Sequence, residues 1–541
     1  MSERLYELLL KTAARAPQRQ ALAGAGCTAA SGMPDGLSYE QLAGSVDAFA
    51  RAAVSLGLER LDRIAVWMDK APATVIAMLG ASRAGCVFVP INPVLKAEQA
   101  AYILRDCNVR LLVTTPERAR SLGATGDPHL PDLRHVALAV ARGAAPADVA
   151  LPGVAAHPFE SLLSETAGSP HRVIDADMTA ILYTSGSTGS PKGVVLSHRN
   201  MVAGAHSVAS YLGNHQDDRI LAVLPLSFDY GLSQLTTAFS VGACAVLHNF
   251  LLPGDVVKAL ARERITGLAA VPPLWIQVAA LDWPAAIDQH LRYFTNSGGA
   301  MPTATLAALR ARMPSAKPYL MYGLTEAFRS TFLPPEEVDR RPTSMGKAIP
   351  NAEILVVRED GSSCAPEEPG ELVHRGALVS LGYWNDPAKT AERFKPLPGQ
   401  RSELVIPELA VWSGDTVRRD AEGFLYFVGR RDEMIKTSGY RVSPTEIEEV
   451  LYRTGLLAEA AAFGVAHPVL GQAVVVVAQP RDGMPPDTER LMEACKAALP
   501  AYMLPSRIDW SAAALPRNAN GKIDRKTLAG ERRSLFENTS A

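Results

Sequence analysis

The sequence predicts an α/β protein, with a large N-terminal body built on several sheets and a small α+β domain after it. Its 541 residues exceed what one hydrophobic core usually organises, so we expect at least two domains. Apolar runs of strand length alternate with helical patterns through roughly the first four hundred residues, which is typical of largely parallel sheets. Near Phe427 the alternation gives way to a charged segment punctuated by glycines, which indicates a change of domain.

Individual elements can be assigned within the N-terminal body. Strand-length apolar runs occur, for example, at residues 63–68, 86–90, 111–114, 220–224 and 243–247. Helices are expected to begin at Ser38, Lys96 and Asp255. No repeat with a period of about 20 to 50 residues is visible, so the sequence does not predict a solenoid.

The C-terminal region has its own pattern of elements. Pro444 predicts the start of a helix, because proline is favoured in the first turn. The apolar stretch 456–479 is interrupted by polar residues, proline and glycine, so it predicts two strands and a turn rather than a membrane span. A helix over 487–498 follows. We place the boundary at Asp432, which gives domains of residues 1–431 and 432–541, the second long enough to fold alone.

Composition limits the partners that the protein can be expected to bind. Hydrophobic residues make up 48% of the chain and charged residues 20%, which is ordinary for a globular protein. The formal net charge of -2 gives no reason to expect nucleic acid or an anionic membrane as partner.

The N-terminus and the cysteines favour a cytoplasmic protein. The first apolar run is interleaved with Glu7, Lys11 and Arg15, so it predicts an amphipathic helix rather than a signal peptide. Six cysteines are scattered without metal-ligand spacing, and we interpret them as small buried apolar residues in a reducing compartment. They are Cys27, Cys86, Cys107, Cys244, Cys364 and Cys495.

The most informative motif is YTSGSTGSPKG at residues 183–193, directly after the strand predicted for 178–182. Such a loop offers hydroxyls and backbone N–H groups to phosphate oxygens, with Lys192 as a point charge. It is not a Walker A loop, since Pro191 precedes the lysine and Gly193 follows it. A flexible linker is the alternative, but a linker needs neither a bounding strand nor an embedded Pro-Lys.

This loop resembles the signature of the acyl-adenylate-forming (AMP-binding) superfamily, which includes acyl-CoA synthetases and peptide-synthetase adenylation domains. Five further motifs of that superfamily follow in its order. They are NSGGA at 296–300, YGLTE at 322–326, WSGD at 412–415, FVGR at 427–430 and PRNANGKIDR at 516–525. The gate sequence FDYG at 228–231 and the last motif look like those of the exosortase A-associated AMP-forming acyl-CoA ligases.

The resemblance implies a nucleotide site and a catalytic set. Lys522 would bridge the acid and the α-phosphate, Glu326 would hold Mg²⁺, and Asp415 would accept the ribose hydroxyls. Hydroxyls of Thr184 and Thr325 would donate to phosphate oxygens. The implied nucleotide-binding residues are Thr184, Ser185, Ser187, Thr188, Lys192, Ser297, Gly298, Gly299, Ala300, Tyr322, Gly323, Thr325, Asp415, Arg430 and Lys522. Glu326, Asp415 and Lys522 each have an alternative interpretation. Glu326 could cap a helix and Asp415 could be a turn residue. Taken without the other motifs, Lys522 would be interpreted as a solvated surface lysine.

The resemblance also implies a second half-reaction and a mobile C-terminal domain. Asp432 occupies the hinge position about which that domain would rotate. In the rotated form Gly439 would line the tunnel for a pantetheine arm, and Lys436 would face the site that Lys522 has left. The thiol would belong to CoA or to the phosphopantetheine of an acyl carrier protein.

The acyl pocket gives a weaker indication of the substrate. By motif alignment its lining comprises Phe228, Asp229, Tyr230, Ser233, Ala270, Thr295, Ser297, Met321 and Arg329. This set is compact and partly polar, and it favours a small polar acid. Asp229 has two interpretations, as the partner of a substrate ammonium group or as the cap of the following helix. Arg329 is a candidate partner for Asp229 or for a second acidic group.

The function predicted from these motifs is ATP-dependent activation of a carboxylic acid to an acyl-AMP, followed by thioester formation with CoA. The alternative is an amino-acid adenylating ligase that loads a separate carrier protein. A dinucleotide-binding oxidoreductase is disfavoured, because GAGCTA at 24–29 runs into further glycine and proline instead of a helix. A non-catalytic protein of the same fold is disfavoured by the retention of the implied catalytic residues.

Overall fold

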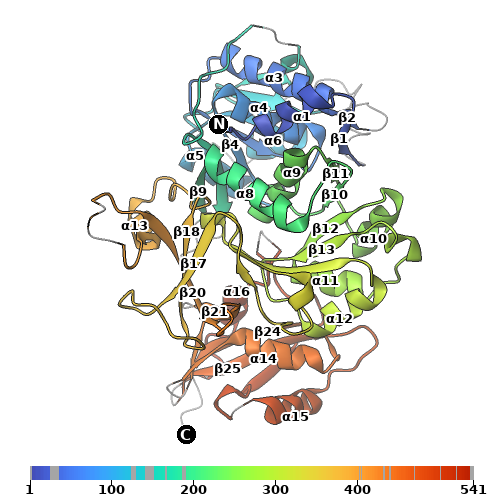
Figure 1. The fold of residues 1–541 in the computed structure, drawn as a ribbon, viewed down its shortest axis with the longest axis vertical. Helices are drawn as coiled ribbons and strands as arrows, with labels where there is room; N and C mark the ends of the chain where they lie inside the picture. Colours follow the sequence, from blue (N-terminus) through green and yellow to red (C-terminus); the bar gives the residue numbers. More distant parts are fainter. Residues whose placement is uncertain are drawn as a thin grey trace.

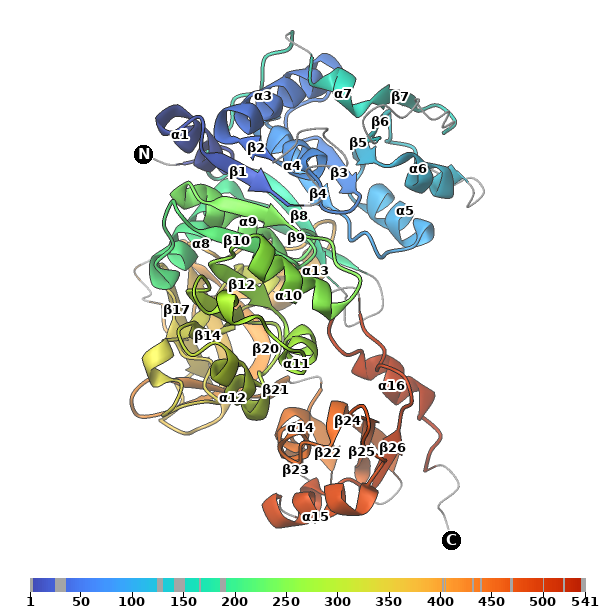
Figure 2. The ribbon, with the colours of Figure 1, turned by 90° about the vertical axis from the view of Figure 1, so that its right-hand side faces the viewer.

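The large body and the small domain are both present in the structure, which is a computed structural model. It describes residues 3–24, 36–123, 130–140, 151–164, 167–184, 191–400, 403, 405–430, 433–437, 440–467, 470–499, 501–518 and 521–536. Elements from the last hundred or so residues gather at one end, below the body (Figure 1). The view turned by 90° shows the same arrangement (Figure 2).

Two large sheets organise the body. Sheet A has the order β16-β15-β14-β13-β12-β10-β11-β1-β2, and sheet B has the order β7-β6-β5-β3-β4-β8-β9. The described strands of sheet A are β1 (Gln20–Ala23), β2 (Leu37–Ser38), β10 (Arg219–Ala222), β11 (Cys244–Leu247), β12 (Gly267–Ala270), β13 (Tyr293–Asn296), β14 (Lys317–Tyr322), β15 (Thr331–Leu333) and β16 (Lys347–Ala348). Those of sheet B are β3 (Arg63–Trp67), β4 (Val87–Pro90), β5 (Val109–Thr114), β6 (His135–Leu138), β7 (Ala155–Pro158), β8 (Met178–Thr184) and β9 (Lys192–Ser197).

The central strands of both sheets pair in parallel, as the alternating pattern predicts. Antiparallel pairing is found at the edges, in β1–β2, β14–β15, β15–β16 and β8–β9. The five example runs coincide with β3, β4, β5, β10 and β11 to within two residues at each end. Central parallel strands are buried on both faces, and this is why they stand out as short apolar runs.

The helices of the body begin close to the predicted positions. Ser38 caps α3 through a capping box with Gln41, and Lys96 occupies the N-cap of α5. The helix expected from Asp255 begins two residues earlier, because Pro253 fills its first turn. The described helices of the body are α1 (Glu7–Arg15), α3 (Tyr39–Ser55), α4 (Pro72–Ala84), α5 (Ala97–Asp106), α6 (Pro116–Gly123), α7 (Phe159–Leu162), α8 (His198–Leu212), α9 (Asp229–Val241), α10 (Pro253–Arg262), α11 (Pro272–Ala279), α12 (Thr303–Arg312) and α13 (Pro387–Arg393).

Sheets A and B share one core. Its buried residues come from strands of both sheets and from helices α3, α4, α8 and α9 between them, including Phe49, Phe88 and Phe239. A second cluster lies on the other side of sheet A and packs Trp275 of α11 against strands β12 and β13. Five described cysteines are free and buried, as predicted, and Cys27 lies outside the described residues.

A third sheet departs from the predicted alternation. Sheet C comprises β17 (Ala352–Val357), β18 (Gly370–Gly376), β19 (Phe394–Pro396), β20 (Leu409–Arg419) and β21 (Leu425–Arg430), all antiparallel. The expectation of βα alternation up to about residue 400 is therefore wrong for its last part. Among the described residues of this sheet only α13 separates two strands, since it lies in the connection that takes the chain from β18 to β19 on the other side of β20.

The small domain has a sheet and a core of its own. Sheet D comprises β22 (Ile435–Thr437), β23 (Tyr440–Val442), β24 (Leu457–His467), β25 (Gly471–Pro480) and β26 (Arg507–Trp510). Its helices are α14 (Pro444–Arg453), α15 (Thr488–Ala498) and α16 (Arg525–Glu531). The stretch 456–479 forms the predicted strand pair, and Pro444 opens the predicted helix. The four described 3₁₀ turns of the chain are η1 (Ala285–Ile287), η2 (Thr325–Ala327), η3 (Pro335–Glu337) and η4 (Ala501–Met503).

Over the described ranges, no helix is both long and apolar enough to cross a bilayer.

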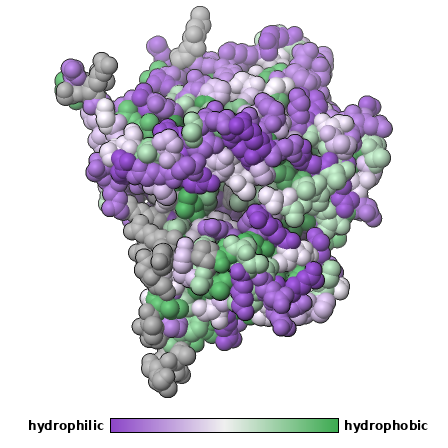
Figure 3. Space-filling model, turned by 60° about the horizontal axis from the view of Figure 1, so that its bottom comes forward, coloured by the Kyte–Doolittle hydropathy of each residue, from purple (hydrophilic) through white to green (hydrophobic). Residues whose placement is uncertain are grey.

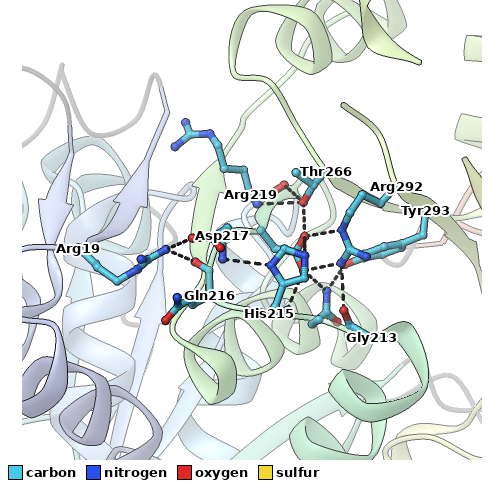
Figure 4. Close-up of polar contacts among 11 residues, drawn as sticks. Arg19, Gly213, His215, Gln216, Asp217, Arg219, Thr266, Arg292 and Tyr293 are labelled. Carbon is cyan, nitrogen blue, oxygen red and sulfur yellow. Dashed lines mark hydrogen bonds and ion pairs between the residues drawn. The ribbon is translucent and has the colours of Figure 1, made fainter. Parts of the chain in front are cut away.

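A buried carboxylate ties the α8–β10 loop to neighbouring strands of sheet A (Figure 4). Both oxygens of Asp218 accept from Arg292, at 2.9 Å from Nε and 2.7 Å from Nη2. Thr266 and Asn214 donate to the same carboxylate. Burial disfavours its charge, but the donors from Arg292, Asn214 and Thr266 outweigh burial and lower the pKa of Asp218.

We predict that Asp218→Asn lowers the free energy of unfolding by about 2 to 3 kcal/mol, because it breaks a buried charge pair. The matched control is Asp217→Asn, whose exposed carboxylate contacts Arg19 and should change stability by less than about 0.5 kcal/mol. Urea denaturation of the two variants checks the difference, and equal midpoints would contradict it.

Candidate active site

The carboxyl ends of four parallel strands define one edge of sheet A. Strands β10, β12, β13 and β14 are consecutive neighbours and run in the same direction. The segments that leave them are therefore delivered to one place, where ligands bind in open α/β sheets. These segments are the gate after β10, Val271 after β12, residues 297–300 after β13 and residues 323–329 after β14.

Sheet B contributes the hydroxyl-rich loop. Thr184 ends β8 and pairs with Lys192 at the start of β9, so the two ends of the motif lie on a hairpin of antiparallel strands. Ser185, Ser187 and Thr188 lie outside the described residues. The Lys192 ammonium lies 5.7 Å from the centre of the Tyr383 ring. Burial, with Lys389 nearby, lowers the pKa of Lys192.

Tyr383 connects this hairpin to Glu326 and was not foreseen from the sequence. Its hydroxyl donates to Glu326 Oε1 at 2.6 Å, and the backbone N–H of Ser380 donates to the Glu326 carbonyl at 2.9 Å. The segment around Tyr383 bridges to β9, with Val194 opposite Tyr383. A lone aromatic residue in a loop carries no periodic signal, so only the fold reveals this role.

Asp415 lies on β20, opposite Arg430 of β21 in sheet C. The Tyr322 hydroxyl at the end of β14 donates to Asp415 Oδ2 at 2.5 Å, and Arg430 Nε lies 3.5 Å from Oδ1. Oδ1 is buried without a hydrogen-bond partner. Burial raises the pKa of Asp415, and burial beside that carboxylate raises the pKa of Tyr322 well above its usual value. The carboxylate thus has one oxygen available for a ligand hydroxyl.

Lys522 reaches the same edge from the small domain. A Cβ added at Gly298, which has φ +82°, would lie 3.3 Å from Lys522 Cε and 3.8 Å from Phe228 Cζ. Burial and Arg430 lower the pKa of Lys522, whereas Asp229 and Asp415 act in the opposite direction. The ammonium therefore lies within electrostatic reach of both the acyl pocket and the Asp415 carboxylate.

The lysine loop and the domain contact are also defined. Asn518 accepts the Lys522 N–H at 3.1 Å, and the Lys522 carbonyl accepts the Asn518 N–H at 2.8 Å. Thr303 at the start of α12 donates to Glu449 of α14 at 2.6 Å, which joins the body to the small domain. In the space-filling view, the displayed face is largely hydrophilic, with small groups of hydrophobic residues between the hydrophilic ones (Figure 3).

Two of the three implied hinge and tunnel residues lie outside the described residues, namely Asp432 and Gly439. The backbone of Lys436 lies in β22, paired with Arg441 of β23. Sheet C ends at Arg430 and sheet D begins at Ile435, so the connection between them is short.

The structure places several of the predicted acyl-pocket residues in contact with one another. All nine predicted residues are buried, and the Tyr230 hydroxyl lies 2.5 Å from Thr295 Oγ1. The capping interpretation of Asp229 is wrong, because the N-cap of α9 is Phe228 and no side chain caps that helix. The expected partnership of Asp229 with Arg329 is confirmed. Asp229 Oδ2 accepts from Arg329 Nη1 at 2.8 Å, with both side chains almost fully buried.

The implied magnesium site contains one protein carboxylate. Glu326 is the implied ligand, and one of its oxygens is engaged by Tyr383. Among the described residues, no group of three or more His, Cys, Asp or Glu side chains is arranged to hold a metal. Mg²⁺ is commonly held by one or two carboxylates together with substrate phosphates and water, so a single glutamate fits that ion.

This edge, with a lysine entering from a second domain, belongs to the fold of adenylate-forming CoA ligases. The anthranilate CoA ligase AuaEII, solved with anthranoyl-AMP, superposes with a TM-score of 0.85 at 23% identity, covering 99% of this chain and 98% of that one. ATP-bound MatB from Rhodopseudomonas palustris gives 0.84 at 23% identity, covering 99% and 100%.

The chain belongs to the AMP-binding enzyme family, whose model matches residues 9–384. The model of the AMP-binding enzyme C-terminal domain matches residues 446–522. Indoleacetate–CoA ligase from Aromatoleum aromaticum is 30% identical, covering 90% of this chain and 91% of that protein. L-proline–[L-prolyl-carrier protein] ligase from Streptomyces coelicolor is 33% identical, covering 91% and 92%. The protein is therefore an AMP-forming acid–thiol ligase, as the motifs predict.

We predict that neutralising Asp415 of β20 and Asp420, just after β20, has opposite effects on stability. A raised pKa means that folding disfavours the Asp415 charge, so this group stabilises the fold only at acidic pH and loses that contribution as pH rises through the folded pKa. Asp415→Asn should therefore raise the melting temperature of the ligand-free protein at pH 8. The gain should shrink towards pH 4, while stabilisation by ATP is lost.

The control is Asp420→Asn. Burial disfavours the Asp420 charge, but the Phe424 N–H, Arg341 and Tyr426 donate to it and lower its pKa. Its contribution is present above about pH 4 and lost below it. The variant should be less stable by about 2 kcal/mol at pH 8, with the difference vanishing on acidification. Thermal scans from about pH 2 to about pH 8 check both signs, because the Asp420 contribution is lost only below about pH 4.

Proposed function

We propose that this edge of sheet A activates a small polar carboxylic acid with ATP and passes the acyl group to the thiol of CoA. The observation that carries the proposal is the position of Lys522. Its side chain lies against Gly298, and its charge interacts with both Asp229 in the acyl pocket and Asp415. A cation in that position is suited to join the acid to the nucleotide.

Adenylation is an in-line attack by a carboxylate oxygen on the α-phosphorus of ATP, with pyrophosphate leaving. Both reactants are anionic, so the site must screen their repulsion and hold them aligned. We assign this screening to Lys522 on the side of the acid and to Lys192 on the side of the leaving pyrophosphate. Thr184 and Thr325 would donate hydroxyl hydrogen bonds to phosphate oxygens.

The remaining nucleotide contacts follow from the unused polar atoms. We assign Oδ1 of Asp415, which accepts no hydrogen bond, to a ribose hydroxyl, with Tyr322 and Arg430 holding the carboxylate. Glu326 would hold Mg²⁺, which neutralises phosphate charge when bound. Residues 297–300 would line the adenine side.

The second half-reaction needs a different position of the small domain. We propose that the domain boundary lies between residues 431 and 432 and that the small domain rotates about Asp432. After rotation Gly439 would line the pantetheine tunnel and Lys436 would face the site that Lys522 has left. Support comes from the separate core of the small domain and from the short connection between Arg430 and Ile435. We also propose a cytoplasmic location.

An amino-acid ligase that loads a carrier protein is the second candidate, because the prolyl-carrier protein ligase is among the relatives. Its substrate ammonium would need an acidic partner in the pocket. Asp229, the candidate for that role, is already paired with Arg329. This contact favours a simple acid over an amino acid.

We predict that Lys522→Ala lowers acid-dependent ATP–pyrophosphate exchange by a factor of about a hundred to a thousand. ATP should still raise the melting temperature, since the remaining nucleotide contacts lie in the body. Lys526→Ala is the matched control, because this exposed lysine lies four residues away on α16. Exchange at the wild-type rate in Lys522→Ala would refute the assigned role.

The acceptor is tested by following thioester formation from a preformed acyl-AMP. We predict acyl-CoA formation with free CoA that exceeds transfer to phosphopantetheinylated carrier proteins. The products can be separated by mass spectrometry. Transfer to the carrier proteins alone would reverse the choice of acceptor and leave the adenylation step intact.

A further inference from the structure

Arg329 is held in the acyl pocket by a strained turn. Phe328, just after η2, has φ +55° and ψ −37°, a backbone conformation that non-glycine residues rarely adopt. The Arg329 N–H donates to the Ala327 carbonyl at 2.6 Å, which closes a three-residue γ-turn. Strain of this kind persists where the surrounding structure fixes it, often at binding sites. The turn leaves the Arg329 side chain 2% exposed.

Only part of this buried guanidinium is used by the protein. Nη1 donates to Asp229 Oδ2 at 2.8 Å, and the group lies 4.7 Å from the centre of the Tyr230 ring. Nε and Nη2 are buried and have no hydrogen-bond partner. Buried donors of a charged group are costly to leave unpaired, so two on one side chain call for an explanation.

The two unpaired nitrogens share one edge of the guanidinium. Nε–H and Nη2–H point in parallel, and this edge is the fork that binds both oxygens of a carboxylate. The Asp229 contact uses the nitrogen on the other side. Asp229 thus holds the arginine in place without occupying its best carboxylate-binding edge.

We propose that the acid activated by this enzyme is a dicarboxylic acid, whose far carboxylate accepts two hydrogen bonds from Nε and Nη2 of Arg329. The inference rests on the proposed function, since the near carboxylate is the one that Lys522 presents to ATP. The two cations would then receive one carboxylate each, and the Asp229 charge remains compensated by Nη1.

The charges of the pocket oppose a substrate amine. An ammonium group beside Asp229 would also lie beside the Arg329 guanidinium and within electrostatic reach of Lys522. Like charges in a desolvated pocket repel strongly, and one aspartate is shared among all of them. An amino acid without an acidic side chain is therefore a poor substrate.

Matched acids test this proposal on the unmodified, full-length protein. ATP–pyrophosphate exchange is measured with malonate against propionate, succinate against butyrate and glutarate against pentanoate, together with L-alanine and L-proline. In at least one pair, the dicarboxylate should exceed its monocarboxylate counterpart in kcat/KM by about a hundredfold or more, because a buried fork rejects a ligand that lacks its acceptor. Comparable values within every pair, or a preference for the amino acids, would overturn it.

A variant series locates the preference on Arg329. Arg329→Met should bring the ratio of dicarboxylate to monocarboxylate near one, and Arg329→Lys should give an intermediate ratio, since lysine offers a point charge without the fork. Arg312→Met, at an exposed arginine of α12, is the control and should keep the wild-type ratio. An unchanged ratio in Arg329→Met would overturn the assignment.

Failure of the inference and failure of the proposed function give different results. Exchange that depends on Lys522 but occurs only with monocarboxylates or amino acids would overturn the inference and keep the adenylation chemistry. Exchange that Lys522→Ala leaves undiminished would count against the proposed catalytic site itself. Should Arg329→Met fail to fold, the wild-type comparison of matched acids still decides the question.

Discussion

The site depends on one geometric constraint, which is that parallel strands end at the same edge of their sheet. Four neighbouring strands of sheet A deliver the gate, Val271, the Gly298 loop and the Tyr322–Arg329 segment to that edge. Sheets B and C then add Lys192 and Asp415 through contacts with Tyr383 and Tyr322. Charged residues that are far apart in the sequence meet there because the loops that carry them leave the sheet at the same edge.

Buried charged groups are hydrogen-bonded to different extents in the scaffold and at the candidate site. The Asp218 carboxylate has donors on both oxygens, and it links loops and strands. At the candidate site, by contrast, one oxygen of Asp415 and two nitrogens of Arg329 are buried without partners. Incomplete pairing lowers the stability of the empty protein, and this is the expected cost of a site prepared for a ligand.

The sequence predicts the parallel core well, because strands buried on both faces leave continuous apolar runs and capping residues mark the helices. It predicts the antiparallel sheet C poorly, since strands such as β20 alternate buried and partly exposed residues and leave no continuous apolar run. Motif order identifies Asp415, Glu326 and Lys522, yet the partners Tyr322 and Tyr383 become visible as contacts only in the fold. Motif alignment proposed Arg329 as a partner of Asp229, but the two lie a hundred residues apart, so only the fold decides between this contact and helix capping.

The same contact bears on how substrate choice can change over evolutionary time. Asp229 follows β10 and Arg329 follows β14, with two strands of sheet A between them. Replacing either residue alone leaves the other charge buried without its partner, which destabilises the protein more than keeping or removing both charges. A change of specificity at this position therefore requires coupled substitutions of Asp229 and Arg329, because each single replacement passes through a less stable protein.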